Sequence, residues 1–61
     1  MTFSVLDVKN NCTIIEAKQP FRVWDIILTL QYFQVDADLL IFSDGYLIGR
    51  YFDGKVMKYE E

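Results

Sequence analysis

The sequence predicts a small α+β domain in which one helix packs on a sheet of five strands. One segment, Pro20 to Phe33, has apolar residues at helical spacing. Turn signals at Asn10-Asn11, Asp44-Gly45 and Asp53-Gly54 separate segments that are rich in β-branched and aromatic residues. We therefore expect the order β-β-α-β-β-β in a single domain over residues 1–61.

The chain opens with a predicted hairpin. Met1 to Val8 is predicted as the first strand and Cys12 to Lys18 as the second, joined by a turn at Lys9 to Asn11, because asparagine tolerates the positive φ of tight turns. The alternation of apolar and polar residues breaks at Leu6 and Val8. A β-bulge or a twist at the end of the strand would account for the break, as would a different register.

The helix is predicted to begin at Pro20, because proline lacks the N–H that a strand needs and suits the first helical turn. Gln19 offers no short side-chain oxygen for the helix N-terminus. Two adjoining apolar rows are expected to be buried: Phe21, Trp24 and Leu28, then Val23, Ile27 and Leu30, widened by Ile26 and Phe33. We expect any binding surface on the other side of the sheet.

Three strands are predicted after the helix. Leu39 to Phe42 is continuously apolar, which is typical of a central strand covered on at least one face, and Phe42 is expected in the core. Tyr46 to Phe52 and Lys55 to Tyr59 follow, joined at Asp53-Gly54. Gly49, inside the second of these strands, predicts a bulge or a close packing contact.

Composition excludes several classes of protein. Of the 61 residues 52% are hydrophobic, which is enough for a compact core without metal or crosslinks. Six basic and nine acidic residues are spread along the chain, so no basic stripe predicts nucleic-acid binding. No apolar segment approaches the roughly 20 residues of a membrane span. A single cysteine, Cys12, allows no internal disulfide and favours a cytoplasmic setting.

Catalytic and metal-binding patterns are weak. The chain has no histidine, which removes the usual nucleophile arrangements and most zinc sites. Asp36-Ala37-Asp38 resembles the opening of a calcium loop, but the glycine and the closing glutamate are missing at their required spacings. No glycine-rich phosphate loop is present. We therefore expect no enzyme activity, no cofactor and no metal site.

Three motifs carry a resemblance to a known family. Val23 to Leu30 resembles the V-x-[DE]-L-L-x-x-L helix of the small sulfur carriers ThiS and MoaD. Asp44 to Arg50 resembles their N-G-x-x-V-x-R segment, and Asp53 to Val56 is similar to their later D-G-D-x-V turn and strand. The resemblance implies a ubiquitin-like β-grasp fold, with a mixed sheet packed on one helix.

One feature departs from that family. The carriers end in Gly-Gly, because only a tail without side chains enters the activating enzyme, whereas this sequence ends Lys58-Tyr59-Glu60-Glu61. We therefore expect a noncatalytic ThiS/MoaD-like protein that binds a protein partner. The resemblance implies an E1-like activating enzyme or a cofactor-biosynthesis enzyme as that partner, and a homodimer is also open.

Two alternatives are also consistent with the sequence. The protein could be a working sulfur carrier whose Gly-Gly tail is absent from this sequence, or a small acidic inhibitor from a mobile element. Whichever holds, arginine and aromatic residues on the last two strands are typical of protein interfaces. The candidate binding residues are Tyr46, Arg50, Tyr51, Phe52, Lys58 and Tyr59.

Overall fold

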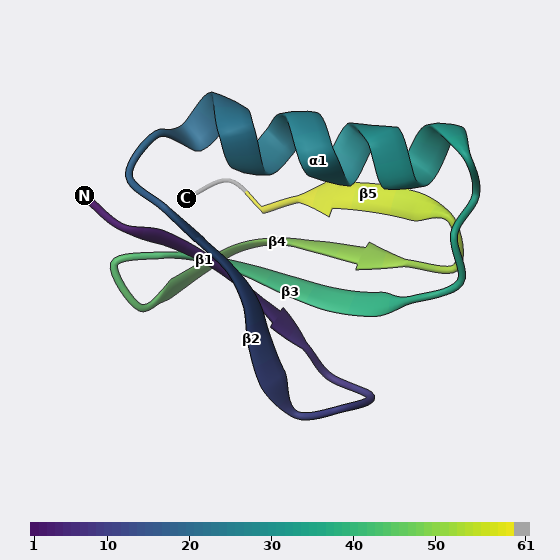
Figure 1. Cartoon of the computed structure of the whole chain (residues 1–61), viewed down its shortest axis with the longest axis horizontal. Helices are drawn as coiled ribbons and strands as arrows, with labels where there is room; N and C mark the ends of the chain where they lie inside the picture. Colours follow the sequence, from purple (N-terminus) through teal and green to yellow (C-terminus); the bar gives the residue numbers. More distant parts are fainter. Residues whose placement is uncertain (60–61) are drawn as a thin grey trace.

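The computed structural model describes residues 1–59 and forms a small α+β domain, as predicted. α1 lies over one face of a sheet (Figure 1). Along the chain the elements are β1 (Phe3–Asp7), β2 (Cys12–Ala17), α1 (Pro20–Tyr32), β3 (Asp38–Ser43), β4 (Tyr46–Phe52) and β5 (Lys55–Lys58). Among the described residues, no helix is both long and apolar enough to cross a membrane.

The five strands lie in the order β2-β1-β3-β4-β5, and every neighbouring pair is antiparallel. The predicted mixed sheet is therefore wrong. The connection through α1 carries the chain from β2, at the edge, to β3, so these two strands run parallel but are separated by β1. The other connections are tight turns, which join antiparallel neighbours.

The predicted turns have the backbone conformation that hairpins need. Asp44 and Gly45 have φ values of 49° and 86°, and Asp53 and Gly54 have 55° and 72°. Positive φ at both central residues matches the twist of the flanking strands. The irregularity predicted near Leu6 is confirmed, because the register of β1 with β2 shifts between Val5 and Leu6.

Gly49 allows a close contact between β4 and the helix. A Cβ atom at this position would lie 2.8 Å from Cη2 of Trp24 and 3.0 Å from the Met57 carbonyl oxygen. The register of β3 with β4 also shifts beside Gly49, between Ile41 and Phe42. The sequence predicted a bulge or a close packing contact at Gly49, and the structure has both.

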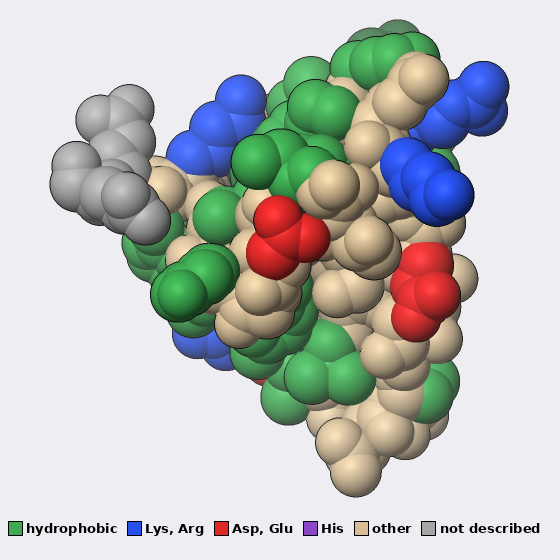
Figure 2. All heavy atoms as spheres, turned by 90° about the vertical axis from the view of Figure 1, so that its left-hand side faces the viewer, with side chains coloured by type: hydrophobic (Ala, Val, Ile, Leu, Met, Phe, Trp, Pro, Cys, Tyr) green, Lys and Arg blue, Asp and Glu red, His purple; other side chains and the backbone are tan. Residues whose placement is uncertain are grey.

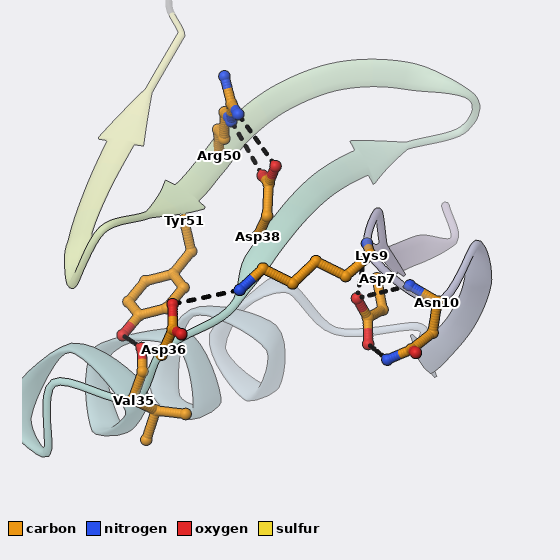
Figure 3. A network of polar contacts seen from close by, with 8 residues as sticks. All are labelled: Asp7, Lys9, Asn10, Val35, Asp36, Asp38, Arg50 and Tyr51. Atoms are coloured by element: carbon orange, nitrogen blue, oxygen red, sulfur yellow. Dashed lines mark hydrogen bonds and ion pairs between the residues drawn. The ribbon is translucent and has the colours of Figure 1, made fainter.

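The core lies between α1 and the sheet. Its buried residues are Phe3, Val5, Val23, Ile27, Leu39, Ile41 and Tyr51. Tyr51 is completely buried, and its hydroxyl lies within hydrogen-bonding distance of the Val35 carbonyl oxygen (Figure 3) and of the Leu30 carbonyl oxygen, which ties β4 to the end of the helix.

The buried stripe of the helix is narrower than the sequence predicts. Val23 and Ile27 are fully buried, whereas Phe21 is 61% exposed and Leu28 is 48% exposed. Successive helical residues are about 100° apart, so a helix centred on the Val23 and Ile27 row turns the Phe21 and Leu28 row to its flank. Ile26, on the opposite flank of the helix, and Phe33, the C-cap residue after α1, were also predicted as buried and are exposed.

Candidate functional site

The side of the sheet that faces away from α1 carries large apolar side chains among its polar ones. In β3, Leu39 and Ile41 point into the core, so Leu40 and Phe42 lie on the other side. The strand register extends this face in a cross-strand row, in which Leu6 pairs with Leu40, Leu40 with Arg50, and Arg50 with Met57. A second row pairs Phe42 with Leu47.

We call this surface the outer face patch; its apolar members are Leu6, Leu40, Phe42, Leu47, Phe52 and Met57. Leu47, Phe52 and Met57 are each about 45% exposed. An antiparallel sheet that is covered on one side is usually polar on the other. Contiguous apolar surface that no described segment covers indicates an interaction site.

Arg50 holds a fixed position within the patch. Its Nε and Nη2 each donate to a carboxylate oxygen of Asp38 at 3.1 Å (Figure 3). The hydrogen bond to Asp38 raises the pKa of Arg50. The guanidinium carbon also lies 4.6 Å from the ring centroid of Phe52. A two-point ion pair and a stacked ring restrict the side chain, so the guanidinium is preorganised for a partner.

The predicted binding residues do not form one site. Arg50 and Phe52 lie together on the outer face, whereas Tyr51 is a core residue. The prediction for Tyr51 is therefore wrong: strand alternation turns it inward beside its outward-facing neighbours, where it cannot touch a partner of the folded protein.

The other three predicted residues lie away from the patch. Tyr46 is exposed at the start of β4, beside the β3–β4 turn. The Lys58 ammonium lies 4.8 Å from the Trp24 ring centroid, on the helix side of β5. Tyr59 follows β5, and its N–H donates to the Ile48 carbonyl.

Sequence reasoning missed five members of the patch: Leu6, Leu40, Phe42, Leu47 and Met57. A signal was present in the continuous apolar run of β3, because four successive apolar residues place two on each face of a strand. Phe42, which was predicted as core, is the clearest example. It is only partly buried, because its side of the sheet has no covering layer among the described residues.

A second apolar surface lies on α1. Phe21, Leu28 and Tyr32 are exposed and share one side of the helix. Viewed from the end of the molecule at the start of α1, hydrophobic side chains lie in several groups, with an acidic side chain among them and basic side chains toward the margins (Figure 2). The guanidinium carbon of Arg22 lies 5.9 Å from the Phe21 ring centroid, but no carboxylate of the described residues pairs with it as Asp38 pairs with Arg50.

A polar hollow of about 520 Å³ lies between the α1–β3 connection and the β4–β5 turn. It is lined by Gln34, Val35, Asp36, Asp53, Gly54 and Lys55. Asp36 already pairs with Lys9 at 3.2 Å, across to the β1–β2 hairpin (Figure 3). Within residues 1–59, no cluster of acidic or cysteine side chains is arranged to hold a metal ion.

The outer face patch thus combines exposed apolar side chains with an arginine held in place by an ion pair, which makes it the strongest candidate for a binding site. Comparisons with protein-family models, with curated proteins and with solved structures gave no match to this chain.

Proposed function

We propose that this domain is a noncatalytic protein-binding module whose partner docks on the outer face patch. The observation that carries the proposal is the cross-strand row from Leu6 through Leu40 and Arg50 to Met57, which no described segment covers. Half-exposed apolar side chains around a fixed arginine are typical of the energetic centre of a protein interface.

The chemistry of the patch restricts the partner. Asp38 already neutralises the charge of Arg50. The partner therefore needs an apolar surface with a hydrogen-bond acceptor for the guanidinium, and it does not need a strongly acidic surface. Burying such a surface is driven mainly by the hydrophobic effect and responds little to salt. An acidic inhibitor that acts by charge would instead lose affinity sharply as salt rises.

The resemblance to ThiS and MoaD adds an E1-like activating enzyme or a cofactor-biosynthesis enzyme as the proposed partner. The β-β-α-β-β-β order supports a β-grasp, but the antiparallel pairing of β1 with β3 is not the mixed sheet that the resemblance implies. The absence of a Gly-Gly tail concerns Glu60 and Glu61, which lie outside the described residues. The proposal therefore depends on the patch and not on the family.

Charge-reversal scanning of the two apolar surfaces tests the proposal. Met57 and Leu47 on the patch and Leu28 on α1 are equally exposed, at 44%, 45% and 48%, so glutamate adds the same charge at each with little effect on the core. The tagged protein and its variants are used to capture partners from an extract of the cells that produce it, followed by quantitative mass spectrometry.

We expect one protein to be recovered with wild type and with Leu28→Glu, in 150 mM and 500 mM salt alike. Its recovery should fall at least tenfold with Met57→Glu and with Leu47→Glu. Loss of the captured protein with Leu28→Glu alone would move the site to the helix. Recovery of no protein would contradict the proposal, and loss at high salt would favour the inhibitor.

A further inference from the structure

The exposed side of α1 carries a row of large apolar side chains, Phe21, Leu28 and Tyr32. Their spacing along the helix places them within about 40° of one another around its axis. Tyr32 is 81% exposed, and the ring of Phe33 packs edge-on against it, with the centroids 5.1 Å apart. The sheet lies on one side of α1 only (Figure 1), so no described segment covers the row.

The two ends of α1 have charges that the chain itself does not balance. Arg22 lies in the first turn, at the positive end of the helix dipole, and no acidic residue accompanies it there. No carboxylate among residues 1–59 forms an ion pair with Arg22. The last turn, at the negative end of the dipole, has no basic residue. The helix therefore has a cation at the end that disfavours one and lacks a cation at the end that favours one.

We propose that α1 pairs with α1 of a second copy of this chain, antiparallel and about a two-fold axis, to form a dimer through the exposed row. This inference is independent of the proposed partner on the outer face patch. The row lies on the helix, on one side of the domain, whereas the patch lies on the face of the sheet that points away from the helix. Both outer face patches therefore stay open in the dimer.

The spacing of the row is complementary to itself. When the two-fold axis lies at the level midway between Ile26 and Ile27, Phe21 lies opposite Tyr32 of the second copy. The two Leu28 side chains are then about 4.5 Å apart along the helix direction, on the same flank, so they meet across the axis. An aromatic pair at each end and a leucine pair in the middle form a continuous contact between the helices.

The antiparallel direction also balances the charges at the helix ends. It brings Arg22 of each copy to the last turn of the other, where the dipole is negative and Phe33 offers an aromatic ring. A parallel pair would instead place the two Arg22 side chains together. Asp25, at the margin of the row, is the cost of this arrangement, because the two Asp25 carboxylates are only about 4.5 Å apart along the helix direction.

The exposed area of the row is near the lower limit for a specific dimer. Covering Phe21, Leu28 and Tyr32 on both copies removes about 800 Å² of surface from water, and specific interfaces bury at least about 1,000 Å². Phe33 and Arg22, on the flank of the row, supply the remainder. Two-fold symmetry uses the row of each copy once, so the assembly closes at a dimer.

Charge placed in the row tests the pairing. Leu28→Glu puts a carboxylate beside the two-fold axis. Met57→Glu is the matched control, because it adds the same charge to a similarly exposed side chain on the other side of the domain. Phe21→Glu is a second variant in the row, and an acidic residue in the first turn suits the helix dipole. Mass is measured by sedimentation equilibrium from 10 µM to 1 mM, and circular dichroism checks the fold.

We expect the mass of wild type and of Met57→Glu to rise with concentration toward twice the 7.2 kDa of one chain. Leu28→Glu should weaken the dimer at least tenfold, because a carboxylate in an apolar interface loses its hydration. If Leu28→Glu does not fold, Phe21→Glu decides in its place. A wild type that stays at 7.2 kDa would overturn the inference, as would a dimer that survives the change in the row or that Met57→Glu disrupts.

The charged residues test the direction of the pairing. Arg22→Gln removes the cation from the last turn of the second copy, so the dissociation constant of the dimer should rise about threefold at low salt. Asp25→Asn removes the repulsion across the axis and should lower the dissociation constant. In a parallel pair Arg22→Gln would relieve a repulsion and strengthen the dimer, and that result would overturn the antiparallel arrangement.

Discussion

Both faces of the sheet carry large apolar side chains, but the two faces have different surroundings. Ile41 and Leu40 are neighbours on β3; Ile41 is completely buried beneath α1, whereas Leu40 lies on the outer face with Leu6 and Arg50 beside it. The inner face holds the fold together, since several of its side chains, Val5, Ile41 and Tyr51 among them, lose all contact with water. The outer face has side chains of the same kind without a cover, so its apolar character points to contact with another molecule.

Alanine at the two neighbouring positions should separate the faces by the largest effect. Ile41→Ala removes fully buried methyl groups and leaves a cavity, so we expect a loss of about 2–5 kcal/mol in the free energy of unfolding. Leu40→Ala should lose about 1 kcal/mol, because part of that side chain is already in water. Urea unfolding, followed by the fluorescence of Trp24, measures both. Equal losses of unfolding free energy in the two variants would show that the outer face contributes as much to stability as the inner face.

Gly49→Ala tests how tightly the inner face packs. The new methyl group would meet Trp24 and the Met57 carbonyl, so we expect a loss of about 1–3 kcal/mol in unfolding free energy. Adding Trp24→Leu should reduce the penalty if the indole is the main obstacle, and the double-mutant cycle measures that coupling. A penalty that stays the same in both backgrounds would assign it to the Met57 backbone instead.

Tyr51→Phe should have a smaller effect. It removes the hydroxyl that donates to Leu30 and Val35 and keeps the buried ring, so we expect a loss of about 0.5–1.5 kcal/mol in unfolding free energy. Tyr46→Phe on the same strand is the matched control, because that side chain is 73% exposed, and we expect no measurable change. Thermal unfolding of the two variants compares them directly. Equal stability would contradict the role of Tyr51 as a link between β4 and α1.

Local features were predictable from the sequence. The start of the helix at Pro20, the turns at Asp44-Gly45 and Asp53-Gly54, and the irregularity near Leu6 all follow from the preferences of a few adjacent residues. The packing of Gly49 was predictable on the same basis.

Features that depend on distant parts of the chain were not predictable. Helical spacing shows two adjoining apolar rows, but the sheet decides that Val23 is buried and Phe21 is not. Tyr51 and Phe52 are both aromatic, and only the strand register shows that the first belongs to the core and the second to the surface. The antiparallel pairing of β1 with β3 depends on the path of the chain over the sheet, which no local motif specifies.

The smallest expected effect concerns the β1–β2 hairpin, whose turn lies outside both faces. Oδ2 of Asp7 accepts a hydrogen bond from the Asn10 side chain, and Oδ1 accepts from the backbone N–H groups of Lys9 and Asn10 (Figure 3). The Asn10 side chain is the largest cause of a pKa of Asp7 below its ordinary value of 3.8. A carboxylate whose pKa is lowered by folding stabilises the folded state above the ordinary pKa, and this contribution is lost as pH falls from that value through the lower pKa of the folded state.

Wild type should therefore be slightly more stable than Asn10→Ala at pH 6, and the two should converge as pH falls below 3.8. Urea unfolding at pH 6, 4 and 2.5 measures the difference. Asp36→Asn is the control, because its pair with Lys9 is exposed and should be screened by 0.5 M salt, whereas the Asn10 effect should persist. A difference that stayed constant with pH would assign the turn's stability to backbone conformation. A difference that converges would show that Asp7 orders the β1–β2 turn locally, independently of whether either face of the sheet is covered.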